Sequence, residues 1–243
     1  MKISSCKSLA EFIIISNIFN QIYSQLQQTA LTNCKQPRKT NLPITKTNVP
    51  MKDPYHKILN LFPEYANAEN TDKALIEQLF HPVTLKKGSV LVEENSIPGY
   101  LYFINTGFIR VYYYHDGEAV TSHINCPNGF ITSFGSFMAQ HRSIEIVECI
   151  TACSVLRISR KDLDLLYERS PKWAEAGRKI YDQSIVYNEQ RTRDILTLSA
   201  EQRYLKLLNE SPELIQQVPL QIIASFIGIK PESLSRIRRQ LIS

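Results

Sequence analysis

The stretch that decides the fold is VPLQIIASFIGIKPESLSRIRRQL, residues 218–241. Its apolar residues recur at helical spacing, as at Leu220 and Ile223, and the pattern resumes after a short interruption. Gly228 lies in that interruption and permits a left-handed turn. Pro231 follows, with a φ already suited to the first position of a helix. The pattern therefore predicts a helix, a tight turn and a second helix.

The second of these helices has two chemically different faces. Leu234, Ile237 and Leu241 follow one another at i, i+3 and i+7 and are expected to point at the core. The opposite face is polar and basic, and an α-helix fits the major groove of DNA. A merely solvated helix surface is the alternative. The candidate DNA-binding residues are Lys230, Glu232, Ser233, Ser235, Arg236 and Arg239.

Bulk composition does not distinguish these alternatives. The net charge is +5, but six bases and one acid in residues 1–50 account for all of it and leave 22 of each sign elsewhere. Only a local patch can therefore favour DNA. No stretch reaches the roughly 18 apolar residues of a membrane helix. The five cysteines are scattered and odd in number, which fits a reducing cytoplasm better than a disulfide framework.

Residues 1–50 differ from the rest of the chain. An interrupted apolar piece, FIIISNIF, precedes a polar stretch rich in Thr, Asn, Gln and Pro. A signal peptide would have a longer clean apolar region and a small-residue cleavage site. We interpret residues 1–50 as a disordered extension or a mis-assigned start, with globular structure beginning near Met51.

The middle of the chain is rich in short strands. Residues 83–159 are rich in Val, Ile, Tyr and Phe and are broken by Gly, Asn and Pro, which indicates a small barrel or roll. Asp116-Gly117 predicts a hairpin turn after alternating residues 109–114. Tyr112, Tyr113 and Tyr114 are interpreted as cross-strand pairs, with a base-stacking surface as the alternative.

This segment resembles the effector domain of the cyclic-AMP receptor and fumarate–nitrate regulator (Crp/Fnr) family. The resemblance rests on KKGSVLVEE, on YFINTGFIRVY and on FITSFGSFMAQHRSIEIVECITACSVLRIS, residues 130–159. In the family the last stretch holds a cyclic nucleotide, with a Glu on the ribose hydroxyl and an Arg-Ser pair on the phosphate.

The likeness is partial in this cassette. Arg142-Ser143 stand at the phosphate pair, but Ser133 replaces the ribose-binding Glu before Phe134-Gly135, and the loop is one residue short. The candidate effector residues are therefore Ser133, Gly135, Arg142 and Ser143. Three alternatives stay open, namely a cyclic nucleotide, another small ligand or no ligand, and we do not expect specificity for cyclic AMP.

The terminal helices resemble the helix-turn-helix of the same family. This resemblance implies base contacts from Glu232 and Arg236, whereas Ser233, Ser235 and Arg239 would contact phosphates. Pro231 stands where a further base-reading Arg often lies, so the recognised sequence should differ. Lys230 replaces the expected capping Ser or Thr.

A long helix is predicted between these parts. Ser170-Pro171 is a cap followed by a helix-starting proline. One face carries Trp173, Ala176, Ile180, Ser184, Tyr187, Arg191 and Asp194. The resemblance implies that this helix pairs two subunits, and we expect that face to be the seam. The alternative is a helix that packs on its own chain.

Together these features predict an α+β fold with a β-roll (double-stranded β-helix-like) effector domain, a long dimerisation helix and a C-terminal winged-helix/helix-turn-helix domain. The expected domains are residues 51–169 (cyclic-nucleotide-binding-like β-roll), 170–198 (dimerisation helix) and 199–243 (DNA-binding). The expected function is a cytoplasmic, homodimeric transcription regulator that reads a palindromic operator.

Double-stranded DNA and a second copy are the expected partners, with RNA polymerase as a further candidate and no membrane. No residues require a cofactor, the five histidines lack the spacing of a metal site, and Cys6 and Cys34 alone cannot hold an iron–sulfur cluster. No set of residues looks catalytic. A signal-binding or protein-interaction module with a vestigial DNA-binding head is the alternative function.

Overall fold

A computed structural model describes residues 53–61 and 70–242 of the chain. The chain divides into two units, residues 1–44 and residues 45–243, and all the described residues belong to the second. The prediction for residues 1–50 therefore lies outside the described residues. Among the described residues, none of the helices combines the length and apolar character that a membrane span requires.

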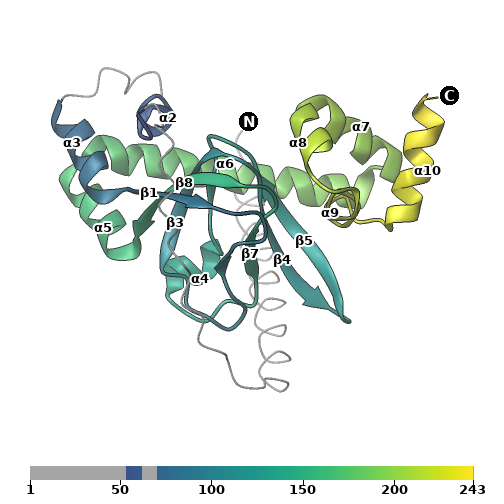
Figure 1. The fold of residues 1–243 in the computed structure, drawn as a ribbon, viewed down its shortest axis with the longest axis horizontal. Coiled ribbons are helices and arrows are strands. Elements are labelled where there is room, and N and C mark those ends of the chain that lie inside the picture. The colour runs from purple at the N-terminus through teal and green to yellow at the C-terminus, as the bar shows by residue number, and fades with distance from the viewer. Residues whose placement is uncertain (1–52, 62–69, 243) are drawn as a thin grey trace, which may run out of the picture. The chain divides into compact units, whose positions relative to one another are not determined.

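The strand-rich middle forms two antiparallel sheets that face each other (Figure 1). One has the order β1-β8-β3-β6, with β1 His81–Leu85, β8 Cys153–Ser159, β3 Tyr100–Thr106 and β6 Phe130–Ile131. The other has the order β2-β7-β4-β5, with β2 Val90–Val92, β7 Ile146–Cys149, β4 Ile109–His115 and β5 Glu118–Asn125. A short helix, α4 (Phe134–Ala139), lies between β6 and β7.

Apolar side chains from both sheets form the core of this roll. Ile104 and Val155 from one sheet pack in the same cluster as Ile109 and Val147 from the other, and all four are fully buried. Cys149 and Cys153 belong to this cluster, as expected for small buried hydrophobes. A hydrogen bond between the two thiols, together with burial, raises the pKa of Cys149.

The predicted hairpin is confirmed. β4 and β5 pair from His115↔Glu118 to Ile109↔Asn125. Asp116 and Gly117 have φ values of 50° and 79°, the left-handed pair that a two-residue hairpin turn requires. Tyr112 lies buried under the guanidinium of Arg110, 4.0 Å from its ring centroid, so it packs against the sheet as expected.

Helices cover one side of the roll. α2 (His56–Leu59), α3 (Asn70–Leu79), α5 (Arg160–Arg169) and the start of α6 (Pro171–Thr197) surround a second apolar cluster. The predicted start of α6 is confirmed, because the Ser170 side chain accepts a hydrogen bond from the Trp173 amide and Pro171 begins the helix. Figure 1 shows α6 running from the roll to the last helices.

Four helices follow α6, and no strand occurs between residues 160 and 242. They are α7 (Ala200–Glu210), α8 (Pro212–Gln217), α9 (Leu220–Phe226) and α10 (Pro231–Ile242). A capping box begins α7, since Ser199 and Gln202 each bond the other's backbone. The predicted fold class is confirmed.

Part of the expected seam along α6 packs on the chain's own residues, while Tyr187 on the same face is 48% exposed. Trp173 and Ala176 are buried against the roll, while the Arg191 side chain donates to the carbonyl oxygen of Phe226 at 2.7 Å and Asp194 pairs with Lys206 of α7. A helical repeat identifies a continuous face, but it does not distinguish an intramolecular contact from a dimer contact. We therefore correct the seam at Trp173, Ala176 and Arg191, whereas the exposed Tyr187 stays a candidate for contact with a second copy.

Gly107 is the tightest turn of the roll. Its φ is +93°, and an added Cβ would lie 2.5 Å from the carbonyl oxygen of Ala152 and 2.6 Å from the thiol of Cys153. Gly117 has a similar φ of +79° with open space around it. We expect Gly107→Ala to lower the free energy of unfolding by about 3 kcal/mol and Gly117→Ala by about 1 kcal/mol, since only the first adds a steric clash to the backbone cost. Urea unfolding of both variants tests this; equal losses would contradict it.

Candidate functional sites in the roll and the terminal helices

The turn between α9 and α10 is fixed by the backbone. The amide of Gly228 bonds the carbonyl oxygen of Ser225 at 3.1 Å, and the amide of Ile229 bonds that of Ala224 at 2.9 Å. This is a Schellman arrangement, and Gly228 supplies its left-handed residue with a φ of 72°. The chain therefore leaves α9 in one defined direction and enters α10 at Pro231.

The apolar face of α10 packs as expected for its first two turns. Leu234 is fully buried and Ile237 is nearly so, in one cluster with Ile223 and Phe226 of α9. Leu241, also expected in the core, is 40% exposed, because the helix extends past the residues that it packs on. The core contact therefore holds the N-terminal part of α10.

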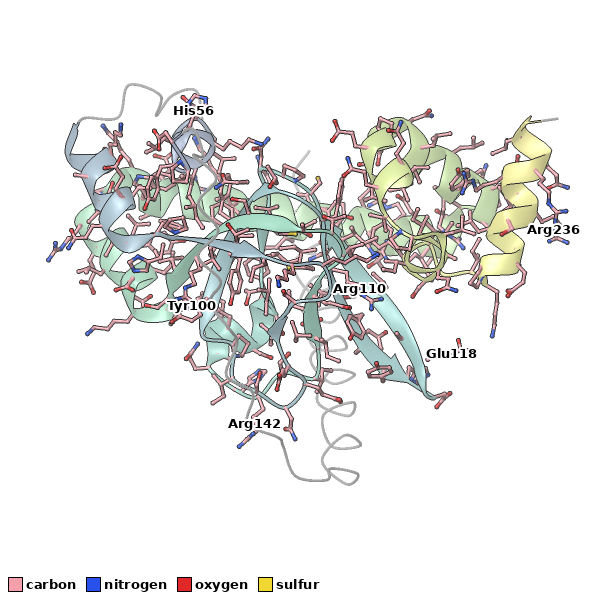
Figure 2. All side chains as sticks on the ribbon, in the orientation of Figure 1. His56, Tyr100, Arg110, Glu118, Arg142 and Arg236 are labelled. Atoms are coloured by element: carbon pink, nitrogen blue, oxygen red, sulfur yellow. The ribbon has the colours of Figure 1, made fainter. Side chains whose placement is uncertain are left out.

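The predicted DNA-binding residues lie together on α10. Glu232, Arg236 and Arg239 are exposed, as is Lys230 just before the helix, and Ser233 and Ser235 are half-buried beside them. Figure 2 shows Arg236 directed away from the other terminal helices. The Arg239 guanidinium donates to the carbonyl oxygen of Ser235 at 3.4 Å, one turn back in the same helix. The basic face is therefore available to a ligand.

Lys230 has a partner in the roll. Its ammonium group lies 3.2 Å from the carboxylate of Glu118, at the tip of the β4–β5 hairpin, and both side chains are largely exposed. Such a surface pair contributes little to stability. It does place the start of α10 next to the hairpin.

A stronger connection joins α9 to the edge of β5. The Ser225 hydroxyl accepts a hydrogen bond from the Thr121 amide at 2.8 Å and donates one to the carbonyl oxygen of Ala119 at 3.0 Å. Phe108, Ile124 and Ile150 of the roll are buried in the same cluster as the terminal helices. One serine side chain thus covers a stretch of strand edge that would otherwise lack partners.

Two arginines hold the C-terminal end of α9. Arg191 of α6 stacks on the Phe226 ring at 3.8 Å while it donates to the Phe226 carbonyl oxygen. Arg203 of α7 donates to the carbonyl oxygens of Ile227 and Leu198 at 2.9 and 2.6 Å. Burial lowers the pKa of Arg191. Helix C-termini favour cations, so these contacts fix α9 to both α6 and α7.

In the roll, the structure brings together only part of the predicted effector set. Ser133 and Ser143 are both buried, and their hydroxyl oxygens lie 2.9 Å apart. Gly135 is exposed at the start of α4. Arg142 is exposed, and its guanidinium donates to the carbonyl oxygen of Asn95 at 2.6 Å (Figure 2). The guanidinium therefore binds a neighbouring loop.

The residue that the sequence did not reveal is Glu145. Its Oε2 atom accepts a hydrogen bond from the Ser133 hydroxyl at 2.6 Å. Glu145 comes directly before β7, two residues after Ser143, and its amide donates to the Ser143 hydroxyl at 3.0 Å. Only its position in the loop after Arg142-Ser143 could have indicated it, because the pattern of the family places the carboxylate at position 133.

Comparison with known proteins agrees with the fold. Residues 82–170 match the profile of the cyclic nucleotide-binding domain. No curated protein matches the chain. The predicted resemblance is confirmed at the level of the fold, because solved structures of Crp/Fnr regulators share the fold of the chain.

Three of these structures illustrate the likeness. FixK2 from Bradyrhizobium japonicum is 18% identical, with a TM-score of 0.59 over 67% of this chain and 84% of that one. A transcriptional regulator of the Crp/Fnr family from Eubacterium rectale is 19% identical, with a TM-score of 0.58 over 75% and 87%. The c-di-GMP responsive global regulator CLP from Xanthomonas campestris is 17% identical, with a TM-score of 0.55 over 71% and 91%.

The Ser225 contact can be tested in the folded chain. Removing its hydroxyl leaves the buried Thr121 amide without an acceptor, so we expect Ser225→Ala to lower the free energy of unfolding by about 1–3 kcal/mol. Hydrogen exchange at Thr121 should accelerate, since this amide loses its partner. Ser235→Ala, in α10, is the control and should leave exchange at Thr121 unchanged. Equal exchange in the two variants would show that Ser225 does not hold the strand edge.

Proposed function

We propose that the chain is a homodimeric transcription regulator of the Crp/Fnr type that reads DNA through α10. The observation that carries the proposal is the polar and basic face of α10, which stands exposed on a helix-turn-helix whose turn and inner face are both fixed. The fold supports it, since proteins that share this fold are described as transcription regulators. The domains of the proposal are the roll in residues 51–169, the connecting helix in 170–198 and the DNA-binding part in 199–243.

Each candidate side chain on α10 or just before it has a role that follows from its chemistry. Arg236 can donate two parallel hydrogen bonds to the O6 and N7 atoms of a guanine, and Glu232 can accept one from a cytosine amino group. Lys230, Ser233, Ser235 and Arg239 bind phosphates, which position the helix without reading sequence. The pair of Lys230 with Glu118 is weak enough to open when a phosphate approaches.

A second copy of the chain is the other proposed partner. The C-terminal half of α6 presents apolar side chains to solvent, since Ile185, Val186 and Leu196 are 53%, 66% and 79% exposed. At 100° per residue these three lie opposite Trp173 and Arg191, on the side that the chain's own residues leave open. Soluble monomers seldom expose contiguous apolar patches.

A groove beside this face adds further surface for the second copy. It has a volume of about 550 Å³ and runs between α6, α7 and the end of α9, with Val186, Tyr187 and Leu207 among its lining residues. Two α6 helices packed on these faces give the two-fold symmetry that a palindromic operator requires.

The roll is proposed to control the distance between the two recognition helices. α6 contacts the roll at its start and the terminal helices at its end, and α9 is bonded to β5. A change in the roll therefore has two routes to α10. RNA polymerase is a candidate partner of the DNA-bound dimer.

The test of DNA reading begins with selection from a random duplex library, which should enrich a two-fold-symmetric site. On that site, Arg236→Ala should weaken binding by about 1–3 kcal/mol, because a bidentate base contact is lost. Arg239→Ala should instead reduce the slope of log K against log salt by about 1, since it removes a phosphate contact.

Fluorescence anisotropy over a salt series measures both effects, with Arg169→Ala in α5 as the control for loss of a positive charge. Absence of an enriched site, or equal effects of all three changes, would favour the alternative of a protein-interaction module whose DNA-binding part is vestigial.

The test of the dimer uses two isoleucines of equal exposure. Ile185 on α6 and Ile97 in the β2–β3 loop are each 53% exposed. Ile185→Glu places a charge in the proposed interface and should shift the chain towards monomer, with at least about a tenfold weaker dimer. Ile97→Glu should leave the dimer intact. Sedimentation equilibrium measures both, and a monomeric wild-type chain or an unaffected Ile185→Glu dimer would refute the interface.

A further inference from the structure

The expected phosphate site of the roll is already occupied by hydrogen bonds within the chain. Ser133 and Ser143 are 0% and 1% exposed. The Ser133 hydroxyl donates to Glu145 Oε2 at 2.6 Å, and the Ser143 hydroxyl lies 2.9 Å from that of Ser133. The Ser143 oxygen in turn accepts from the Glu145 amide at 3.0 Å. Both serines are therefore bonded to one residue.

The direction of these hydrogen bonds follows from the number of protons. A serine hydroxyl has one proton, and a carboxylate only accepts. Ser133 must therefore give its proton to Glu145, and Ser143 can donate to Ser133 or, at 2.9 Å, to the Glu145 carbonyl oxygen. Neither arrangement leaves a hydroxyl proton for an incoming phosphate. The two hydroxyls solvate a negative charge that the chain itself supplies.

The cation expected beside them is directed elsewhere. The Arg142 guanidinium donates to the Asn95 carbonyl oxygen, and Glu145 makes no ion pair with any residue that the structure describes. A phosphate that entered the site would meet the Glu145 carboxylate while the Arg142 guanidinium is engaged by the Asn95 carbonyl oxygen. Like charges at such a distance repel, and partial burial strengthens the repulsion.

We propose that Glu145 is the specificity-determining residue of the roll, an internal carboxylate that fills the anion site and excludes cyclic nucleotide phosphates. Removal of its charge opens the site to them. The inference rests on the proposed function as a regulator, because it states which ligands this regulator refuses. It also gives a physical reason for the absence of specificity for cyclic AMP that the sequence predicts.

A second, opposite role for the Glu145 carboxylate must be tested. A carboxylate near Ser133 lies close to where a Glu at position 133 would place its own, so Glu145 could instead accept the ribose hydroxyl of a bound nucleotide. The two roles predict opposite signs on substitution. As an internal occupant Glu145 prevents binding, and as a ribose acceptor it is required for binding.

The experiment measures thermal stability and calorimetric binding of the full chain with up to about 1 mM cyclic AMP. The wild-type chain should show no saturable rise in melting temperature. Glu145→Gln keeps an acceptor for Ser133 and removes the charge, so it should show a saturable rise, with affinity at least about tenfold tighter than the wild-type limit. Glu145→Gln combined with Arg142→Ala should lose this gain, because the phosphate then has no guanidinium to recruit.

Glu168→Gln, an exposed change on α5, is the control for loss of an acid elsewhere. Glu145→Ser provides a second opening of the site if Glu145→Gln is unfolded by circular dichroism. Binding by the wild-type chain that Glu145→Gln abolishes would assign the ribose role and overturn the proposal, as would no binding by either folded variant. DNA binding of each variant without ligand is measured separately, so a failure of the regulator function is distinguished from a failure of this inference.

Discussion

The contact between Ser225 and the edge of β5 is the constraint on which the position of α10 depends. β5 is the last strand of its sheet, and a free strand edge exposes unpaired amide and carbonyl groups. Ser225 satisfies one of each, at Thr121 and Ala119. Because Ser225 lies in α9 and its carbonyl oxygen takes part in the Schellman turn, the same residue that closes the sheet edge also orients the turn into α10.

The surroundings of Ser225 make this contact cooperative with the rest of the chain. The apolar cluster of the terminal helices also contains three residues of the roll, Phe108, Ile124 and Ile150. The end of α9 is bonded by Arg191 of α6 and by Arg203 of α7. Loss of either arginine would leave a carbonyl oxygen at the end of α9 without its donor. The roll and the terminal helices are thus joined by a buried interface, in contrast to the weak surface pair of Lys230 and Glu118.

Local sequence chemistry predicted those elements whose geometry depends on a few neighbouring residues. Asp116-Gly117 indicated its hairpin, Ser170-Pro171 the start of α6, and Gly228 and Pro231 the turn before α10, because caps and left-handed positions restrict which residues can occupy them. The same reasoning placed the candidate DNA-binding residues on one helix. It could not test their role, since a helix face shows what is available for contact and not what binds it.

The sequence could not predict which surfaces pack together when they lie far apart along the chain. The repeat along α6 identified a true face, but that face packs in part on the chain's own roll and α9. The large apolar residues of α6 left to solvent are Ile185, Val186, Tyr187, Ile195 and Leu196. A period of 3.6 residues gives the direction of a side chain around its helix and contains no information about which chain lies opposite. Leu241 shows the same limit. Its spacing places it on the apolar face of α10, but it is 40% exposed because α10 extends past the helices that it packs on.

Glu145 was missed for a related reason, and it changes how the roll must be understood. The pattern of the family places a carboxylate at position 133 of the cassette in residues 130–159, and this chain has a serine there. The chemistry of a folded site depends on which atoms lie close together. Glu145, twelve residues after Ser133, places its carboxylate within hydrogen-bond distance of that serine. A site that contains its own anion has no need of an external one to hold α4 and β7 together. The roll is then a complete folded unit without ligand, and any control over α6 must act on that closed state.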